Sequence, residues 1–261
     1  MSDVGRYLYC IIEESDHKTF GPLGVGGQGD ELISVPYQGL VCVVSHSPIV
    51  EYPVTREHTM AHHQAIERVM QEYAVLPVRF STIAKSDEEI IEKVLKPRYG
   101  EFKRGLSWIS GKEAIEVRAS WVNMDTVFQE LAQESPSVQA LKAKIAGKPP
   151  AATYYDRIEL GTLVEALLKD KRKMTADRVL ETLKVHACEF RDNSEKLYGD
   201  QPICNLSFLV EEEHAIAFDQ AVAGLRAASN GRMTFKVNHR VAPFDFVTIV
   251  IQLDEASRVS A

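Results

Sequence analysis

The sequence lacks the cysteine patterns that define several protein classes. Its four cysteines, Cys10, Cys42, Cys188 and Cys204, are spread through 261 residues, and none of them forms a CxxC pair. A zinc ribbon or a thioredoxin-type redox motif is therefore not expected. This usage predicts reduced, mostly buried thiols of a cytoplasmic protein.

Long hydrophobic runs and clustered positive charge are missing as well. The longest apolar stretches, at 40–45 and 246–251, have the length of strands, whereas a membrane-spanning helix needs about 20 apolar residues. The chain starts Met-Ser-Asp without a basic region before an apolar one, so we expect no secretory signal. The net charge is −7 and there is no long basic run, which argues against binding nucleic acid through phosphate contacts.

Motifs of catalysis and cofactor binding are also scarce. The loop 24–29 matches GxGxxG, but the strand-like run ELISVPY follows it instead of the helix that a dinucleotide site requires. His186 and Cys188 lie two positions apart, so on a helix they face different directions and cannot form a dyad. No nucleophile elbow, P-loop or spaced acid pair is present. We predict neither an enzyme nor a bound cofactor.

The positive signals describe an α+β protein with two domains. Residues 1–110 predict an N-terminal mixed α+β domain in the order β-β-β-α-β-α. The expected strands cover 6–13, 31–37, 39–46 and 75–80, and the expected helices cover 56–73 and 86–97. Thr55 is a plausible N-cap, and Ser86 with Glu89 three residues later forms a capping box. Pro97 should break or kink the second helix.

Residues 111–261 predict a C-terminal domain of different design. Strands are expected at 113–122, 203–210, 233–240 and 244–253, and helices at 124–146, 152–198 and 212–228. Alternating apolar residues define the strands, and i, i+3, i+7 stripes define the helices. The order is close to a split βαβ, ferredoxin-like sandwich with a helical insertion.

The helical insertion, residues 152–198, carries two apolar stripes. Leu163 and Leu167 belong to the first stripe, and Leu183 and Phe190 to the second, with the lysine-rich segment 169–175 between them. This pattern predicts a helical hairpin or an extended helical arm.

Histidines on the helix 56–73 invite a metal-binding interpretation. His58 and His62 are four residues apart, a spacing that can hold zinc. The zincin motif HExxH needs Glu after the first histidine, and Thr59 stands there instead. Helical phase places His62 four residues before the apolar Ile66, on the same face. We therefore predict that His62 is a packed, hydrogen-bonded histidine under the sheet.

The segment AVLPVRFST follows this helix directly. In a strand, Leu76, Val78 and Phe80 would point to one side and Pro77 and Arg79 to the other. Pro77 cannot donate to a ladder, which indicates an edge or irregular strand. An arginine flanked by apolar residues is typical of a bidentate carboxylate partner. For Arg79 we favour a structural ion pair over contact with a binding partner.

Four motifs occur in a fixed order along the chain: RYLYCII, HxxAIERVM, VLPVRFST and NLSFLV. In this respect the sequence resembles the gas vesicle protein F/L family, whose members carry a V-L-P-hydrophobic-R-F-G-T segment after a histidine-bearing helix. Ser81 replaces the glycine of that segment, and VAPFDFVTI replaces a proline-rich C-terminal run. The resemblance assigns a structural or partner-binding role to His62, Leu76, Pro77, Arg79, Phe80 and Thr82.

The resemblance implies a non-enzymatic accessory protein with no cofactor and no metal. Such a protein binds the small hydrophobic gas vesicle shell protein and other accessory proteins during vesicle nucleation and assembly, or is a minor wall component. It implies a cytoplasmic location in association with the gas vesicle. It also implies two α+β domains, the C-terminal one a modified ferredoxin-like fold.

Two other functions stay open at the level of sequence. One is a ferredoxin-like regulatory module that binds a small molecule in a polar pocket between the domains. The other, more remote, is a metal-dependent hydrolase that uses His58 and His62.

Overall fold

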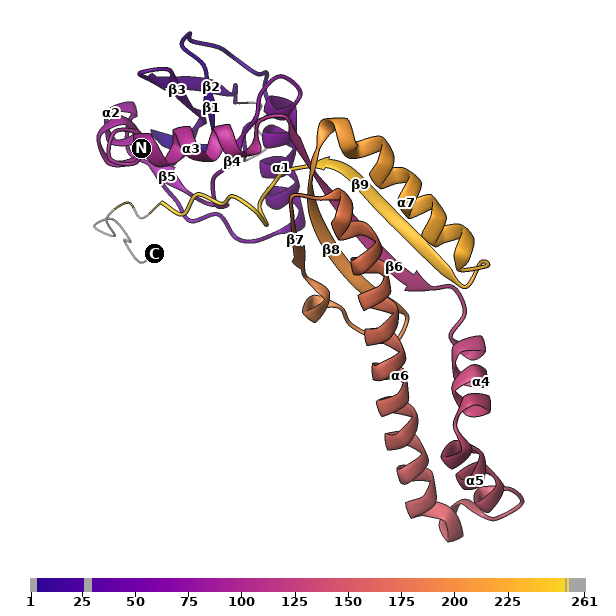
Figure 1. The fold of residues 1–261 in the computed structure, drawn as a ribbon. Coiled ribbons are helices and arrows are strands. Elements are labelled where there is room, and N and C mark those ends of the chain that lie inside the picture. Colours follow the sequence, from indigo (N-terminus) through magenta and orange to yellow (C-terminus); the bar gives the residue numbers. More distant parts are fainter. Residues whose placement is uncertain (1–3, 26–29, 252, 254–261) are drawn as a thin grey trace. The chain divides into compact units, whose positions relative to one another are not determined.

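The computed structural model describes residues 4–25, 30–251 and 253. The protein is a mixed α+β structure with two antiparallel sheets and the helices α1 to α7 (Figure 1). The chain forms two compact units. Unit 1 contains the chain up to Ala114 and again from Arg240 on, and unit 2 contains Ile115–His239. Residues 26–29 of the glycine-rich loop lie outside the described residues.

Unit 1 is built on a sheet with the order β2-β3-β1-β4, with β5 also paired to β1. Its strands are β1 (Val4–Glu13), β2 (Ile33–Tyr37), β3 (Leu40–Pro48), β4 (Leu76–Pro77) and β5 (Ile83–Ala84). Its helices are α1 (Arg56–Met70), α2 (Asp87–Ile90), the π-helical turn η1 (Ile91–Leu95) and α3 (Tyr99–Ile109). β1 pairs antiparallel with β3, β4 and β5.

Both faces of this sheet are buried. Tyr7 and Ile12 of β1 belong to a core with Ile66 of α1. Leu8 and Ile11 belong to a second core, which includes residues of η1 and α3. A strand buried on both sides must be apolar at almost every position, which explains the run LYCII in the middle of β1.

The helix starts of unit 1 agree with the capping signals in the sequence. Thr55 Oγ1 accepts a hydrogen bond from the backbone N–H of His58 at the start of α1. Ser86 Oγ accepts one from the N–H of Glu89, whose carboxylate in turn accepts from the N–H of Lys85. As expected, the helical run breaks at Pro97, between η1 and α3.

Unit 2 contains a sheet with the order β7-β8-β6-β9. Its strands are β6 (Lys112–Trp121), β7 (Glu189–Asp192), β8 (Pro202–Glu211) and β9 (Met233–Val241), of which β6 and β9 extend into unit 1 at one end. Its helices are α4 (Met124–Glu134), α5 (Pro136–Ile145), α6 (Tyr154–Leu183) and α7 (Ala215–Ala228). Short 3-10 turns are η2 (Pro150–Thr153), η3 (Lys184–His186), η4 (Ser194–Lys196) and η5 (Glu212–His214). One core joins β6, β8 and β9 to α4, α6 and α7.

The helical insertion is a single long helix and not a hairpin. α6 runs unbroken for 30 residues, through the lysine-rich segment 169–175 (Figure 1). That segment has neither Gly nor Pro, and its lysines and arginine are good helix formers. Lys171 also pairs with Glu130 and Glu134 of α4. The charged run is therefore a packed part of the helix rather than a connection.

The prediction that the second apolar stripe of the insertion continues on a helix to Phe190 was wrong. α6 stops at Leu183, and Phe190 lies in strand β7, opposite Phe208 of β8. The segment Glu-Phe-Arg-Asp is too short and too charged to give a strand pattern of its own. Its strand conformation depends on the hydrogen bonds of the neighbouring β8.

The predicted strand 244–253 does not form in the residues that the structure describes there, and this segment groups with unit 1. Position 252 lies outside them. The alternating pattern itself is used, because Val247, Ile249, Ile251 and Leu253 pack against a core of unit 1. Ile249 forms an isolated parallel bridge with Val78. The predicted alternation of apolar side chains is thus present, but these side chains pack in unit 1 and not in the sheet of unit 2.

In the described part of the chain, no helix has both the length and the apolar character that crossing a membrane would require.

Candidate functional site: the segment after α1 and the buried His62

The segment AVLPVRFST is an irregular connection that sits between β1 and the C-terminal segment. Only Leu76 and Pro77 form a strand, so the predicted strand 75–80 is much shorter than expected. The N–H of Val78 donates to the carbonyl of Tyr9, and Pro77 O accepts from the N–H of Ile249. Pro77 thus occupies a place where no donor is needed on its nitrogen.

The segment leaves strand geometry before Phe80, which lies in a turn with Ser81, a residue with a left-handed φ of 62°. Phe80 therefore does not share a side with Leu76 and Val78, and the predicted alternation was wrong at this position. Leu76 and Val78 belong to the core that includes α3, whereas Phe80 packs on the opposite core, with α1. The segment therefore contributes to both cores of unit 1.

His62 is fully buried on α1, on the apolar face that its helical phase predicts. Its Nε2 lies 3.2 Å from the carbonyl oxygen of Val78, so Nε2 carries the proton and donates it to that bond. Its Nδ1 then accepts from the hydroxyl of Tyr7, 3.2 Å away. Tyr7 Oη in turn accepts from the N–H of Ser81 at 2.9 Å. One chain of hydrogen bonds thus ties α1, β1 and the segment together.

Aromatic rings surround His62. The ring of Tyr9 is stacked at 5.7 Å between centroids, and that of Phe80 meets it edge-on at 5.6 Å. Burial in this apolar setting, with a smaller effect of the neighbouring His63, lowers the pKa of His62 to about 4. Burial also raises the pKa of Tyr9 to about 12. Both side chains are therefore neutral at physiological pH.

The other histidines of α1 are engaged separately. His58 Nδ1 donates to the carbonyl of Pro53 at 3.1 Å, and its ring meets Tyr52 edge-on. His63 stacks on Phe244, with centroids 5.0 Å apart. Both ring nitrogens of His62 are used within the fold. Over the described residues, no three His, Cys, Asp or Glu side chains are grouped as metal ligands.

Arg79 and Thr82 complete the segment. Thr82 Oγ1 donates to the carbonyl of Arg79 at 2.7 Å, which closes the turn. The side chain of Arg79 is exposed and has no ion-pair partner among the residues that the structure describes. The structural ion pair that we favoured for Arg79 is therefore not found there.

Ser81 makes a contact that glycine could not make. Its Oγ accepts a hydrogen bond from the backbone N–H of Tyr52 at 3.0 Å. A left-handed non-glycine residue costs roughly 1–2 kcal/mol, and a hydrogen bond of this kind returns about 1 kcal/mol. The backbone cost of Ser81 is thus compensated locally.

Sequence reasoning missed the partners Tyr7, Tyr52 and Phe244. For Tyr7 a signal was available: a tyrosine in a strand buried on both faces must find a partner for its hydroxyl. For the stacking of Phe244 on His63 and the hydrogen bond from Tyr52 to Ser81 no local signal exists, because each contact joins segments far apart in the chain. The whole arrangement presents buried, neutral, hydrogen-bonded groups. Its geometry serves to hold the segment in place.

The family model "Gas vesicle synthesis protein GvpL/GvpF" matches residues 5–248. The chain is 29% identical to gas vesicle protein F of Streptomyces sp. over 94% of its own length and 100% of that protein's. It is 24% identical to gas vesicle protein F1 of Halobacterium salinarum, over 95% of each chain.

Solved structures share the fold. The crystal structure of the gas vesicle protein GvpF from Anabaena sp. aligns with a TM-score of 0.80 at 21% identity, covering 95% of this chain and 99% of that one. GvpF from Microcystis aeruginosa aligns with a TM-score of 0.72 at 22% identity, covering 93% and 98%.

The family match places the chain among the accessory proteins of the gas vesicle. The chain belongs to the GvpL/GvpF family of gas vesicle synthesis proteins.

Proposed function

We propose that the protein binds the small hydrophobic shell protein of the gas vesicle, and other accessory proteins, during vesicle nucleation and assembly. It acts in the cytoplasm in association with the growing vesicle, without enzymatic activity. The observation that carries the proposal is the family match, which extends over residues 5–248 and thus over both units.

Physical reasoning supports this role. A shell subunit with a very apolar surface aggregates unless another protein covers that surface before assembly. The accessory protein must itself expose apolar side chains to do so. Val54 in unit 1, and Tyr155 and Met174 in unit 2, are each more than 70% exposed. Arg79 is also exposed. The family resemblance assigns it a structural or partner-binding role, so it is a further candidate for partner contact.

We also propose that the two units are separate domains, close to the predicted 1–110 and 111–261, and that unit 2 is a modified ferredoxin-like fold. Its elements run β6-α4-α5-α6-β7-β8-α7-β9, and its strands are ordered β7-β8-β6-β9. A split βαβ-βαβ chain in which α4, α5 and α6 occupy the first crossover has this order. The proposed boundaries differ from the predicted ones in the segment from Arg240 on, which groups with unit 1.

Co-expression tests the central proposal. The tagged chain and the shell protein are produced together in a host without gas vesicle genes and then purified on the tag. We expect the shell protein to remain in the unaggregated fraction only when the chain is present. An unrelated acidic protein of similar size serves as the control.

Deletion in the source organism gives the second readout. We expect a loss of vesicles in electron micrographs, restored by the gene on a plasmid. Normal vesicle formation after deletion, together with no association in the co-expression experiment, would reject the proposal.

A further inference from the structure

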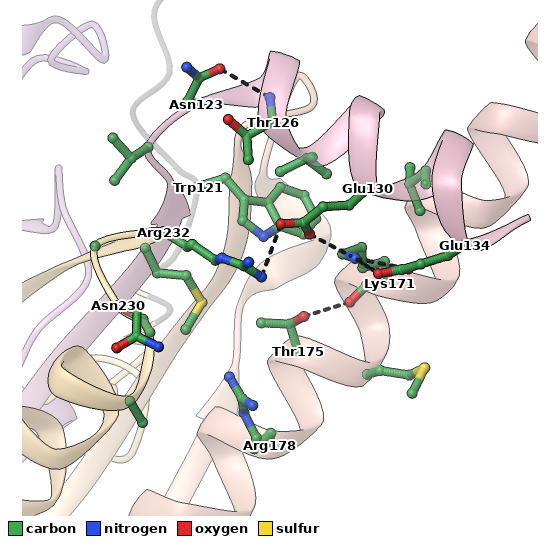
Figure 2. A pocket seen from close by; sticks show the side chains of 18 of the residues that line it. Trp121, Asn123, Thr126, Glu130, Glu134, Lys171, Thr175, Arg178, Asn230 and Arg232 are labelled. Carbon is green, nitrogen blue, oxygen red and sulfur yellow. Dashed lines mark hydrogen bonds and ion pairs between the residues drawn. The ribbon is translucent and has the colours of Figure 1, made fainter.

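Unit 2 contains a cavity of about 750 Å³ between α4 and α6, closed at one end by the end of β6 and the turn from α7 to β9 (Figure 2). One wall is the stretch from Asn123 to Glu134, and the facing wall is the stretch from Leu167 to Arg178. We call this cavity the α4–α6 groove.

Both walls have the same spacing. The lining positions are 123, 126, 127, 130, 131 and 134 on one helix and 167, 170, 171, 174, 175 and 178 on the other. Steps of three and four residues place each set on a single helical face. At 1.5 Å per residue each face extends over about 16 Å, or three turns. Two such faces side by side are the seams into which a third helix inserts its side chains.

The floor of the groove is apolar. Trp121, Val127 and Leu131 are almost fully buried there. The apolar surface continues out of the groove, because Val122 is 50% exposed and Met174 is 73% exposed on its rim. A site for a small molecule encloses most of its ligand. Apolar surface that continues beyond the cavity instead suits a segment of a larger partner.

Ion pairs hold the groove together at one end. Glu130 Oε2 lies 3.0 Å from Lys171 Nζ on α6, and Glu130 Oε1 lies 2.9 Å from Arg232 Nη1 on the turn before β9. Figure 2 shows these side chains beside Trp121, with Arg178 two turns further along α6. Three elements are thus fixed around a shared carboxylate.

Several polar groups of the groove lack either a hydrogen bond or an ion pair in the part of the chain that the structure describes. Glu130 Oε1 is buried and has no hydrogen bond of good geometry, although Arg232 is close. The indole N–H of Trp121 has no hydrogen bond among the described residues, and neither Asp170 nor Arg178 has an ion-pair partner among them. Asp170 and Arg178 are eight positions apart on α6, or about 12 Å.

We propose that the α4–α6 groove is the docking site for an amphipathic helix of a partner protein, about three turns long. The apolar face of that helix packs on Met174 and Val122 at the rim, above the floor that Trp121 and Leu131 form. A carboxylate and a cation about two turns apart on it pair with Arg178 and Asp170. This inference rests on the proposed function for the claim that the partner is a gas vesicle protein.

The probes for the test are synthetic 20-residue peptides that tile the shell protein and the other gas vesicle proteins of the source organism. The chain has two tryptophans, so the full-length Trp108→Phe variant leaves Trp121 as the sole indole. We expect at least one amphipathic peptide to shift the emission of Trp121 on titration.

Groove variants then locate the binding. Arg178→Glu and Met174→Glu, both at exposed positions of α6, should weaken Kd at least tenfold. Lys169→Glu is the matched control: it reverses an exposed charge on the same helix, outside the groove, and should leave Kd unchanged. A peptide whose acidic residue is changed to Lys should regain affinity for Arg178→Glu.

The inference is overturned when no peptide binds, or when the binding peptides have equal Kd for wild type and both groove variants. Shell protein that co-purifies equally with all variants, when no peptide of another gas vesicle protein binds in the groove, would overturn the docking site and leave the proposed function intact. A peptide from another gas vesicle protein that binds in the groove, with no shell protein co-purifying, would support the docking site and reject shell binding.

Discussion

His62 Nε2 donates a hydrogen bond to the main-chain carbonyl of Val78, 3.2 Å away, and this contact fixes the segment AVLPVRFST to helix α1. The bond joins two of the motifs on which the resemblance to the family rests. It uses the histidine as a neutral, buried donor and acceptor, so the motif is explained by packing and hydrogen bonding.

The buried state of His62 predicts how stability depends on pH. Its pKa is about 4 in the folded protein and about 6.5 in the unfolded chain. Above pH 6.5 the residue is neutral in both states and contributes no pH dependence. Between pH 6.5 and 4 only the unfolded state binds the proton, so the free energy of unfolding falls by about 1.4 kcal/mol per pH unit, roughly 3 kcal/mol in total. Below pH 4 this contribution is constant.

Urea unfolding of wild type and His62→Asn at pH 7, 6, 5 and 4 measures this effect. Carboxylates titrate in the same range, so the informative quantity is the difference between the two proteins. We expect His62→Asn to be less stable at pH 7 and the gap to narrow as the pH falls. A gap that stays constant from pH 7 to pH 4 would contradict the buried neutral histidine.

Ser81 predicts an unusual order among its variants. Ser81→Gly removes the cost of the left-handed backbone and also the hydrogen bond from Tyr52, so we expect a change in stability within about 1 kcal/mol. Ser81→Ala keeps the backbone cost and loses the bond, so we expect a loss of about 1–2 kcal/mol. Thermal and urea unfolding of the three proteins measures the order. Ala as stable as Ser would show that the hydroxyl contributes nothing.

Gly5 lies where no side chain fits. A Cβ there would approach the carbonyl oxygen of Ala84 to 2.4 Å and Ile49 Cγ1 to 2.8 Å. We expect Gly5→Ala to cost about 1–3 kcal/mol, because β1 and β5 must move apart. Gly161→Ala is the matched control: in the middle of α6 an added Cβ meets nothing within 4 Å, and it should stabilise by roughly 1 kcal/mol. Equal unfolding midpoints for the two variants would contradict this packing.

Local signals predicted the parts of the fold that local physics decides. The caps at Thr55 and Ser86 and the stop of α7 at Asn230 and Gly231, both with positive φ, were legible because each involves residues a few positions apart. The burial of His62 followed from helical phase alone. These features depend on no distant segment.

Features that depend on distant partners were not predictable. Phe190 fits a helical stripe and a strand equally well, and only the neighbouring β8 decides for the strand. Arg79 looked like a structural ion-pair residue, and nothing local shows that its side chain is exposed. The groove could be predicted only in part. The spacing of three and four residues is present in the sequence of both helices, but the sequence does not show that these two helical faces lie opposite each other in the fold.

The segment after β9 belongs to unit 1, and substitutions at two neighbouring residues of this segment test that assignment. Ile249 is buried and exchanges hydrogen bonds with Pro77 and Arg79, whereas its neighbour Val250 is half exposed. We expect Ile249→Ala to cost about 2–4 kcal/mol, because it leaves a cavity in the core of unit 1. Val250→Ala should change stability by less than about 0.5 kcal/mol.

Amide hydrogen exchange shows where the loss falls. With Ile249→Ala we expect faster exchange in β1 and at residues 76–79, and unchanged protection in β8. This follows because native proteins open locally in units that share a core. If protection falls in β8 and not in β1, the segment stabilises unit 2, and its assignment to unit 1 is contradicted.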